Sequence, residues 1–255
     1  MHSALPESPG ISGANPPGVF STAEVGRLAG YSVQQVRDLE RLGVLPPAPR
    51  AANGYRRYDA RHVIAVRAYR ALAAAIGPVA ARTVLPALAA GPIDDAASRI
   101  DELHADLALE RRRVREALRG LDTVLAEVAE EFDDRDAMTI GELAQALGVR
   151  ASALRHWERE GLVRTTRSAG SGARSFGALA VTEARITAAL RAGGYGIPAI
   201  RSILQEVRAH GDPGDAQRIL QQRLAELTRR SVALLEAAGP LHDLLTSTPA
   251  ETRGE

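Results

Sequence analysis

The fold of this 255-residue chain is decided by residues 20–58, FSTAEVGRLAGYSVQQVRDLERLGVLPPAPRAANGYRRY, and by residues 138–176, MTIGELAQALGVRASALRHWEREGLVRTTRSAGSGARSF. The two stretches align without a gap at an offset of 118 residues. A repeat at a fixed offset indicates a duplicated structural unit, and we infer a tandem duplication of a module of about 70 residues. The positions that share a residue include Glu24 and Glu142, Gly30 and Gly148, Arg37 and Arg155, Glu40 and Glu158, Gly43 and Gly161, and Arg56 and Arg174.

Each stretch opens with the pattern of two short helices joined by a turn. Ser21 and Glu24 are spaced as a capping box, in which a hydroxyl and a carboxylate satisfy backbone amides at a helix start, and the second stretch repeats the pattern. We expect a short first helix, a turn at the glycine that follows it, and a second helix over residues 33–42 or 151–160. This is the spacing of a helix-turn-helix.

Each second helix is followed by the pattern of a small two-stranded wing. Short β-prone pieces flank a loop of polar residues, Gly and Pro, and the later piece reads GYRRY at residues 54–58 and GARSF at residues 172–176. Two further helices then close each module, and we expect them over residues 60–75, 78–88, 182–192 and 198–209.

A long helical stretch follows each module. In residues 93–136 the apolar residues advance by three, four or seven positions, which keeps them on one face and predicts a coiled-coil helix. Residues 211–246 follow the same spacing until Pro240, which lacks a backbone N–H and is expected to interrupt the helix. The second coil is therefore expected to be shorter than the first.

Together these patterns predict a helix-dominated fold with two winged helix-turn-helix domains, each followed by a coiled-coil helix. Asp136 at the end of the first coil stands two residues before Met138 at the start of the second module. An antiparallel pairing of the two coils within one chain would therefore make a monomeric pseudo-dimer, and a homodimer with four modules is the alternative. The expected segments are a disordered leader (1–18), head 1 (19–92), coil 1 (93–136), head 2 (137–210), coil 2 (211–246) and a tail (247–255).

Charge is distributed unevenly along a chain whose net charge is only +1. All 32 basic residues are arginines. Residues 20–70 hold nine Arg against four acids, residues 138–191 hold eight against four, and coil 1 holds seven against fourteen. Two basic heads beside an acidic coil indicate a polyanionic partner, and DNA fits because arginines that neutralise phosphates release counterions.

Several other classes of protein are disfavoured by composition. The chain has no Cys, which excludes disulfides and thiolate metal sites, and its six His lack ligand spacing. We find no nucleophile with a base, no phosphate loop and no metal cluster, so we expect neither an enzyme nor a cofactor. The first residues lack the pattern of a signal peptide and no long apolar run occurs, so we expect a cytoplasmic protein.

The residues of both heads resemble the MerR family of bacterial transcription regulators, in residues 20–63 of head 1 and residues 138–163 of head 2. In that family a winged helix reads the major groove, the wing contacts phosphates, and an antiparallel coiled coil joins two subunits. The family dimer bends and untwists a promoter whose polymerase elements are spaced too far apart. The resemblance therefore implies double-stranded promoter DNA as the partner, with RNA polymerase as a further candidate.

The resemblance also assigns DNA contacts to individual residues. The start of the recognition helix is where side chains reach base edges or phosphates, and wing arginines contact phosphates, which positions the protein without specifying a sequence. Tyr55 either joins the wing contacts or packs against the wing, and Tyr58 and Trp157 are expected in the core. The candidate contacts are Gln34, Gln35 and Arg37 with Ser152, Arg155 and His156 on the recognition helices, and Tyr55, Arg56, Arg57 and Arg174 on the wings.

Head 1 departs from the family pattern at one informative place. The family usually carries two aromatic residues between the Arg and the Glu of the recognition helix, whereas head 1 has Asp38 and Leu39. Asp38 either repels a phosphate, which would weaken head 1, or points elsewhere. No separate effector domain is expected after coil 2, so ligand control has no support. The alternative function is a non-catalytic adaptor or antagonist that pairs with another regulator through its coils.

Overall fold

The computed structural model describes residues 18–128, 137–167 and 174–247, so the expected leader and tail lie almost wholly outside the described residues. The chain divides into two compact units, which are described separately below. Unit 1 comprises residues 1–102 and 230–255, and unit 2 comprises residues 103–229. The boundaries between the units fall inside the two long helices, α5 (Ile93–Val128) and α10 (Gly214–Thr246).

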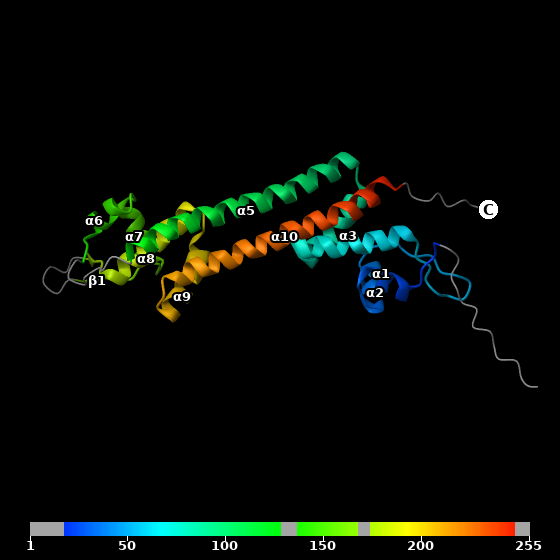
Figure 1. Cartoon of the computed structure of the whole chain (residues 1–255), viewed down its shortest axis with the longest axis horizontal. Coiled ribbons are helices and arrows are strands. Elements are labelled where there is room, and N and C mark those ends of the chain that lie inside the picture. The colour runs from blue at the N-terminus through cyan, green and yellow to red at the C-terminus, as the bar shows by residue number, and fades with distance from the viewer. Residues whose placement is uncertain (1–17, 129–136, 168–173, 248–255) are drawn as a thin grey trace, which may run out of the picture. The chain divides into compact units, whose positions relative to one another are not determined.

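Unit 1 contains head 1, in which two short helices pack on a longer pair. The elements are α1 (Thr22–Ala29), α2 (Val33–Arg41), α3 (Ala60–Ile76) and α4 (Pro78–Ala90), and Figure 1 shows α1 and α2 beside α3. The apolar faces of these helices meet in one core because residues three and four apart share a helix face. Its fully buried members include Val25, Val36, Tyr58, Val66, Leu72 and Leu85.

Unit 2 repeats the arrangement in head 2. The elements are α6 (Ile140–Ala146), α7 (Ala151–Arg159), β1 (Thr166–Arg167), β2 (Arg174–Ser175), α8 (Ala178–Ala192) and α9 (Ile197–His210). Helix α8 begins four residues before the expected start because its N-cap is Gly177, which has no side chain to mark the boundary in the sequence. Its core residues include Leu143, Leu154, Trp157, Leu162, Phe176, Ile186 and Leu204, and the burial of Trp157 and Tyr58 agrees with expectation.

The helix starts follow the capping chemistry that the sequence predicts. Ser21, Ser32 and Thr139 each accept a hydrogen bond from the backbone N–H three residues on, and each forms a capping box. The N-cap of α7 is Arg150, which makes no such bond. An N-cap hydrogen bond stabilises a helix by about 1 kcal/mol, so the recognition helix α2 has a local support that α7 lacks.

The wings are smaller than predicted. In head 2, β1 and β2 pair antiparallel, with Thr166 opposite Ser175, and the residues between the strands lie outside the described part. In head 1 the corresponding pairing is a single bridge between Arg50 and Arg56, and no strand is present in residues 18–92. The loop before Arg50 contains three prolines, which cannot donate to a ladder, so a longer pairing does not form there.

Helices α5 and α10 run antiparallel within unit 2. Glu110 of α5 pairs with Arg223 of α10, and the Nη2 group of Arg111 donates to the carbonyl of Leu227 over 3.1 Å. Farther along α5, the Oδ1 atom of Asp122 accepts from the Nε2 group of Gln217 over 2.7 Å. Residue numbers therefore rise along α5 as they fall along α10, as in an antiparallel pair.

The apolar face of α5 also packs against head 2, so the pattern of buried residues along α5 differs from the predicted heptad pattern. Ala117 and Val124 are buried, whereas Leu118 and Leu125, which the heptad spacing placed on this face, are only partly buried. Gly120 lies against α8, where a Cβ at this position would come within 2.8 Å of the Cβ of Ala189. Small residues on α5 are therefore buried because a second helix approaches closely at that point.

The prediction that Pro240 interrupts the second coil is wrong. Helix α10 continues through Pro240 to Thr246 and has 33 residues against 36 in α5. A proline inside a helix costs about 3 kcal/mol. Leu241 and Leu244 are buried beside it, and burial of each is favourable by about 1.5–3 kcal/mol, so packing in unit 1 offsets the local cost.

The last part of α10 packs on head 1. The Nε group of Arg230 donates to the carbonyl of Ala75 over 2.7 Å, and the Nη1 group of Arg61 donates to the carbonyl of Ser247 over 2.8 Å. Helix α10 therefore begins in unit 2, directly after head 2, and ends against the domain at the start of the chain.

Candidate nucleic-acid interface

In head 1 the outer face of α2 carries the predicted contact residues. Gln34, Gln35 and Arg37 are all exposed. The Oε1 atom of Gln35 accepts the N–H of Ser32 over 2.8 Å, so this side chain also closes the capping box. Gln34 and Arg37 are the members of this group that no cap restrains.

In head 2 the corresponding face belongs to α7. Ser152, Arg155 and His156 are exposed, as predicted for residues that reach a ligand. Within residues 18–128, 137–167 and 174–247, neither Arg37 nor Arg155 has an ion-pair partner. Each head thus presents an unpaired guanidinium at this same position of the repeated module.

Asp38 is engaged with its own helix. Its Oδ1 atom accepts from the Nη2 group of Arg41 over 3.0 Å and from the Nε2 group of Gln34 over 3.2 Å. The hydrogen bond from Arg41, and to a smaller extent the one from Gln34, lowers the pKa of Asp38. Its carboxyl group therefore stays ionised at neutral pH. The carboxylate therefore neutralises one arginine of the recognition helix and holds one of its amides.

Glu40 joins the recognition helix to the wing in head 1. Its Oε2 atom accepts from the Nε group of Arg56 over 2.7 Å and from the hydroxyl of Tyr58 over 3.0 Å, and its Oε1 atom accepts the N–H of Ala48 over 3.2 Å. The Arg56 side chain is only 29% exposed. Arg56, predicted as a phosphate contact, is thus first of all an anchor that fixes the wing on α2.

The remaining predicted wing residues differ in their surroundings. Tyr55 is 75% exposed, so it does not pack against the wing, and Arg57 is exposed as well. Arg174 lies in β2, and its side chain is outside the described part of the structure. In head 2 the carboxylate that corresponds to Glu40 is that of Glu158, which accepts from the Thr165 hydroxyl over 2.8 Å.

Some arginines counted toward the basic charge of head 1 have a structural role instead. Arg70 donates to the carbonyl of Ala29 over 3.0 Å, and Arg67 donates to the carbonyl of Leu28 over 3.3 Å. Both carbonyls belong to the C-terminal turn of α1, where cations are favourable because the helix dipole is negative there. These pairings link residues about forty positions apart, and no local pattern could predict them.

Head 2 contains a buried ionic cluster that the sequence also did not reveal. Glu183 of α8 is only 5% exposed. It accepts from the backbone N–H and Nε group of Arg164, each over 2.9 Å, and from the Nε group of Arg208 over 2.8 Å. Arg208 also donates to the carbonyls of Gly161 and Leu162. The cluster ties α9 to the loop that follows the recognition helix α7.

Two tandem helix-turn-helix modules, each with an exposed second helix that carries an unpaired arginine, define a DNA-binding protein of the regulator class. Comparison with protein families agrees: residues 138–207 match the MerR HTH family regulatory protein, and residues 21–58 match the MerR family regulatory protein. The chain therefore carries two MerR-family helix-turn-helix domains, and that family is one of regulators and not of enzymes. Searches of curated proteins and of solved structures returned no match.

Two kinds of feature are absent from the described residues. None of the described helices combines the length and apolar character needed to cross a membrane. In the same part of the chain, no three or more His, Asp or Glu side chains are arranged to hold a metal ion.

Proposed function

We propose that the protein is a cytoplasmic, sequence-specific transcription regulator in which two unlike heads bind one promoter site and distort it. The observation that carries the proposal is the pair of exposed, unpaired arginines, Arg37 and Arg155, at equivalent positions of two helix-turn-helix modules. Arginine at the start of a recognition helix contacts guanine edges or phosphates. RNA polymerase is a further proposed partner at such a promoter.

The test is the salt dependence of DNA binding by the full chain, on a site found by genome-wide mapping and footprinting. Arg37→Ala and Arg155→Ala are each expected to weaken binding. If the lost contact is to phosphate, the salt slope also falls by about one unit, whereas loss of a base contact relaxes specificity at one position. Arg99→Ala, on α5, serves as a control for the loss of one positive charge. Unchanged affinity, slope and specificity in both head variants would contradict the proposal.

The two heads are proposed to read different half-sites. Head 1 offers Gln34, Gln35 and Arg37, whereas head 2 offers Ser152, Arg155 and His156, and unlike side chains prefer unlike base edges. A binding site selected from random DNA is therefore expected to have two unlike halves. A perfect palindrome with one chain bound across it argues against this reading.

We further propose that one chain acts as a pseudo-dimer. The antiparallel contacts of α5 with α10, and the contacts of Arg230 and Arg61 that join the end of α10 to head 1, support it. Coils linked in one chain meet at an effective concentration in the millimolar range, which a second chain at low micromolar concentration does not match. Light scattering is expected to give a mass near 27.1 kDa, and a stable mass of twice that value refutes the proposal.

The second candidate is a non-catalytic adaptor that pairs with another regulator through its coils. The pairing of Asp38 with Arg41 and Gln34 favours it for head 1, because the carboxylate neutralises one arginine of the recognition helix and so weakens its attraction for phosphate. An adaptor lacks the steep salt dependence of phosphate contacts. Retention on a DNA column at increasing salt therefore distinguishes the two functions.

A further inference from the structure

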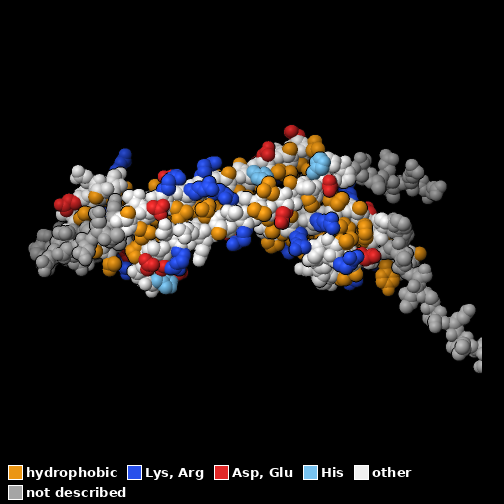
Figure 2. Space-filling view, viewed as in Figure 1, with side chains coloured by type: hydrophobic (Ala, Val, Ile, Leu, Met, Phe, Trp, Pro, Cys, Tyr) orange, Lys and Arg blue, Asp and Glu red, His pale blue; other side chains and the backbone are white. Residues whose placement is uncertain are grey.

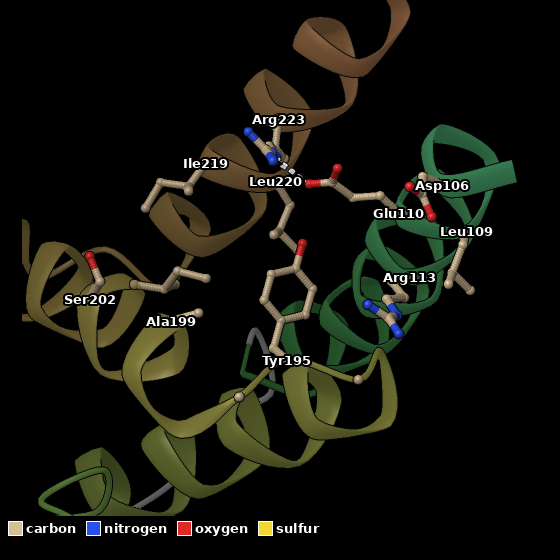
Figure 3. Close-up of a pocket in the computed structure, with 13 residues that line it drawn as sticks. Asp106, Leu109, Glu110, Arg113, Tyr195, Ala199, Ser202, Ile219, Leu220 and Arg223 are labelled. Carbon is tan, nitrogen blue, oxygen red and sulfur yellow. Dashed lines mark hydrogen bonds and ion pairs between the residues drawn. The ribbon is translucent and has the colours of Figure 1, made fainter. Parts of the chain in front are cut away.

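Unit 2 contains a hollow of about 620 Å³ that the DNA-binding role does not use. It is bounded by α5, by the turn between α8 and α9, by α9 itself and by the first turns of α10. Figure 3 shows Tyr195 standing in its middle, with Ala199 and Ser202 on one side and Arg113 and Leu109 on the other. The volume lies within the range of about 300–1,000 Å³ that small-molecule sites occupy.

The floor of the hollow suits a flat apolar body. Tyr195 is half-buried, and burial raises the pKa of its hydroxyl, which stays neutral at physiological pH. Around it lie the aliphatic side chains of Ile203, Ile219 and Leu220. An aromatic ring beside aliphatic groups favours a planar ligand, which buries area on both of its faces.

Charge at the hollow favours a ligand with an anionic group at one end. Glu110 and Arg223 neutralise each other in an ion pair. Arg113 is exposed, and its guanidinium has no hydrogen-bond or ion-pair partner among the described residues. It also lines a second hollow beside Gly193 and Gly194, together with Arg112, Arg115 and Arg119.

Arg112, Arg113, Arg115 and Arg119 form a basic cluster in coil 1, which is acidic overall. Figure 2 shows basic side chains gathered over this part of α5. Arg112 and Arg115, like Arg113, have no ion-pair partner in the described part of the chain. Asp106, an acid that lines the first hollow and is unpaired within the described residues, lies seven residues before Arg113, about two turns nearer the start of α5. An anionic group would therefore be held at the arginine end.

The residues that line the hollow differ from those at the corresponding positions of the first module. After the single inserted residue, Tyr195 corresponds to Ile76 in head 1, and Gly194 corresponds to Ala75. In unit 1 the carbonyl of Ala75 is occupied by Arg230, so the arginine from α10 there has a backbone partner. In unit 2 the arginine beside Gly194 is Arg113, which keeps its guanidinium available.

We propose that this hollow binds a small organic anion with a planar apolar body, such as an aromatic carboxylate, sulfonate or phosphate. Tyr195 stacks with the body, and Arg113 binds the anionic group. Because the walls come from α5, α10 and head 2 together, a bound ligand favours the packed arrangement of both long helices on head 2. The site stands on these side chains alone and does not depend on DNA binding.

The test uses two fluorescent probes on the full chain without DNA. One is 8-anilinonaphthalene-1-sulfonate, and the other is N-phenyl-1-naphthylamine, which has the same rings without the sulfonate. One saturable site is expected for the sulfonate, with affinity about tenfold above that of the neutral amine, as for a charge-assisted hydrogen bond. Arg113→Gln is expected to remove that difference and to leave the affinity for the amine unchanged.

Two further variants make the result specific to the hollow. Ala199→Trp fills the cavity from an exposed position and is expected to lower the affinity for both probes at least about tenfold. Arg27→Gln removes an exposed arginine of α1 and is expected to change neither. Circular dichroism checks that each variant retains its helices.

The proposal is overturned if the sulfonate binds Arg113→Gln or Ala199→Trp as tightly as it binds the original chain. It is equally overturned if Arg27→Gln has the same effect as Arg113→Gln, because the arginines would then act as a diffuse surface charge. A chain that binds the probe as expected and fails to bind DNA refutes the proposed function and leaves the site intact.

Discussion

The ionic cluster around Glu183 makes a quantitative prediction about the stability of head 2. Glu183→Ala removes a carboxylate that is 5% exposed and accepts three hydrogen bonds, two from Arg164 and one from Arg208. The Arg164 side chain is 61% exposed and can turn to water, whereas that of Arg208 is only 20% exposed. Most of the cost therefore comes from Arg208.

Removal of one partner of a buried ion pair costs about 3–5 kcal/mol. Arg208 keeps its hydrogen bonds to two backbone carbonyls, so we expect the lower end of this range, about 3 kcal/mol of unfolding free energy. With a urea dependence of about 2 kcal/mol per molar, the unfolding midpoint of head 2 falls by about 1.5 M.

The chain offers a selective probe for this measurement. Its single tryptophan, Trp157, is buried in α7, so the change in tryptophan fluorescence with urea reports on head 2 and not on head 1. Glu206→Ala removes an exposed glutamate of α9 and is the matched control, for which no shift is expected. A loss below about 1 kcal/mol for Glu183→Ala, or an equal loss for the control, refutes the assignment of the cluster as a support of head 2.

Three further predictions concern other sites. Asp38→Asn frees Arg41 and is expected to tighten DNA binding at low salt and to steepen the salt dependence of binding by about one unit. The measurement is a salt titration of DNA binding, and Asp101→Asn on α5 is the control for the same change of charge. At Asp59 burial raises the pKa, but hydrogen bonds from His62 outweigh it and lower the pKa below its usual value. The ionised carboxylate of Asp59 therefore stabilises the folded state above its ordinary pKa, and this stability is lost as pH falls through the lowered pKa of the folded state. On lowering the pH below about 4, the protection of α3 amides against hydrogen exchange is expected to fall less in Asp59→Asn than in the original chain. Gly120→Val places a side chain against α8 and is expected to destabilise unit 2 by about 1–3 kcal/mol in urea unfolding, whereas no effect would show that the two helices do not pack this closely.

The architecture of the heads follows from interactions that are local in the sequence. The capping boxes at Ser21, Ser32 and Thr139 join residues three positions apart, and the apolar periodicity of each short helix selects the face that packs. Such patterns are complete within about ten residues, so the helix-turn-helix modules and their duplication could be predicted. The exposure of Arg37 and Arg155 was predictable for the same reason.

The features that local reasoning missed involve competition between local preference and distant packing. Pro240 is a helix breaker in any local reading, but α10 passes through it because Leu241 and Leu244 are buried in unit 1. Arg56 has the position of a phosphate contact, but a carboxylate sixteen residues away holds it. The partner of Arg56 could not be chosen from the sequence, because every arginine of the heads has several candidate acids.

Local interactions suffice to predict two basic helix-turn-helix modules in tandem and the exposed residues at the start of each recognition helix, because helix periodicity and capping act over a few residues. The packing of distant segments settles which arginines are paired inside the fold, as at Arg70 and Arg208, and which remain unpaired, as at Arg113. The hollow around Tyr195 likewise depends on packing, because its walls come from segments as far apart as Asp106 and Arg223, which are 117 positions apart in the sequence. An ion pair or a cavity depends on distances in space, and these distances are set only when distant segments of the chain pack together.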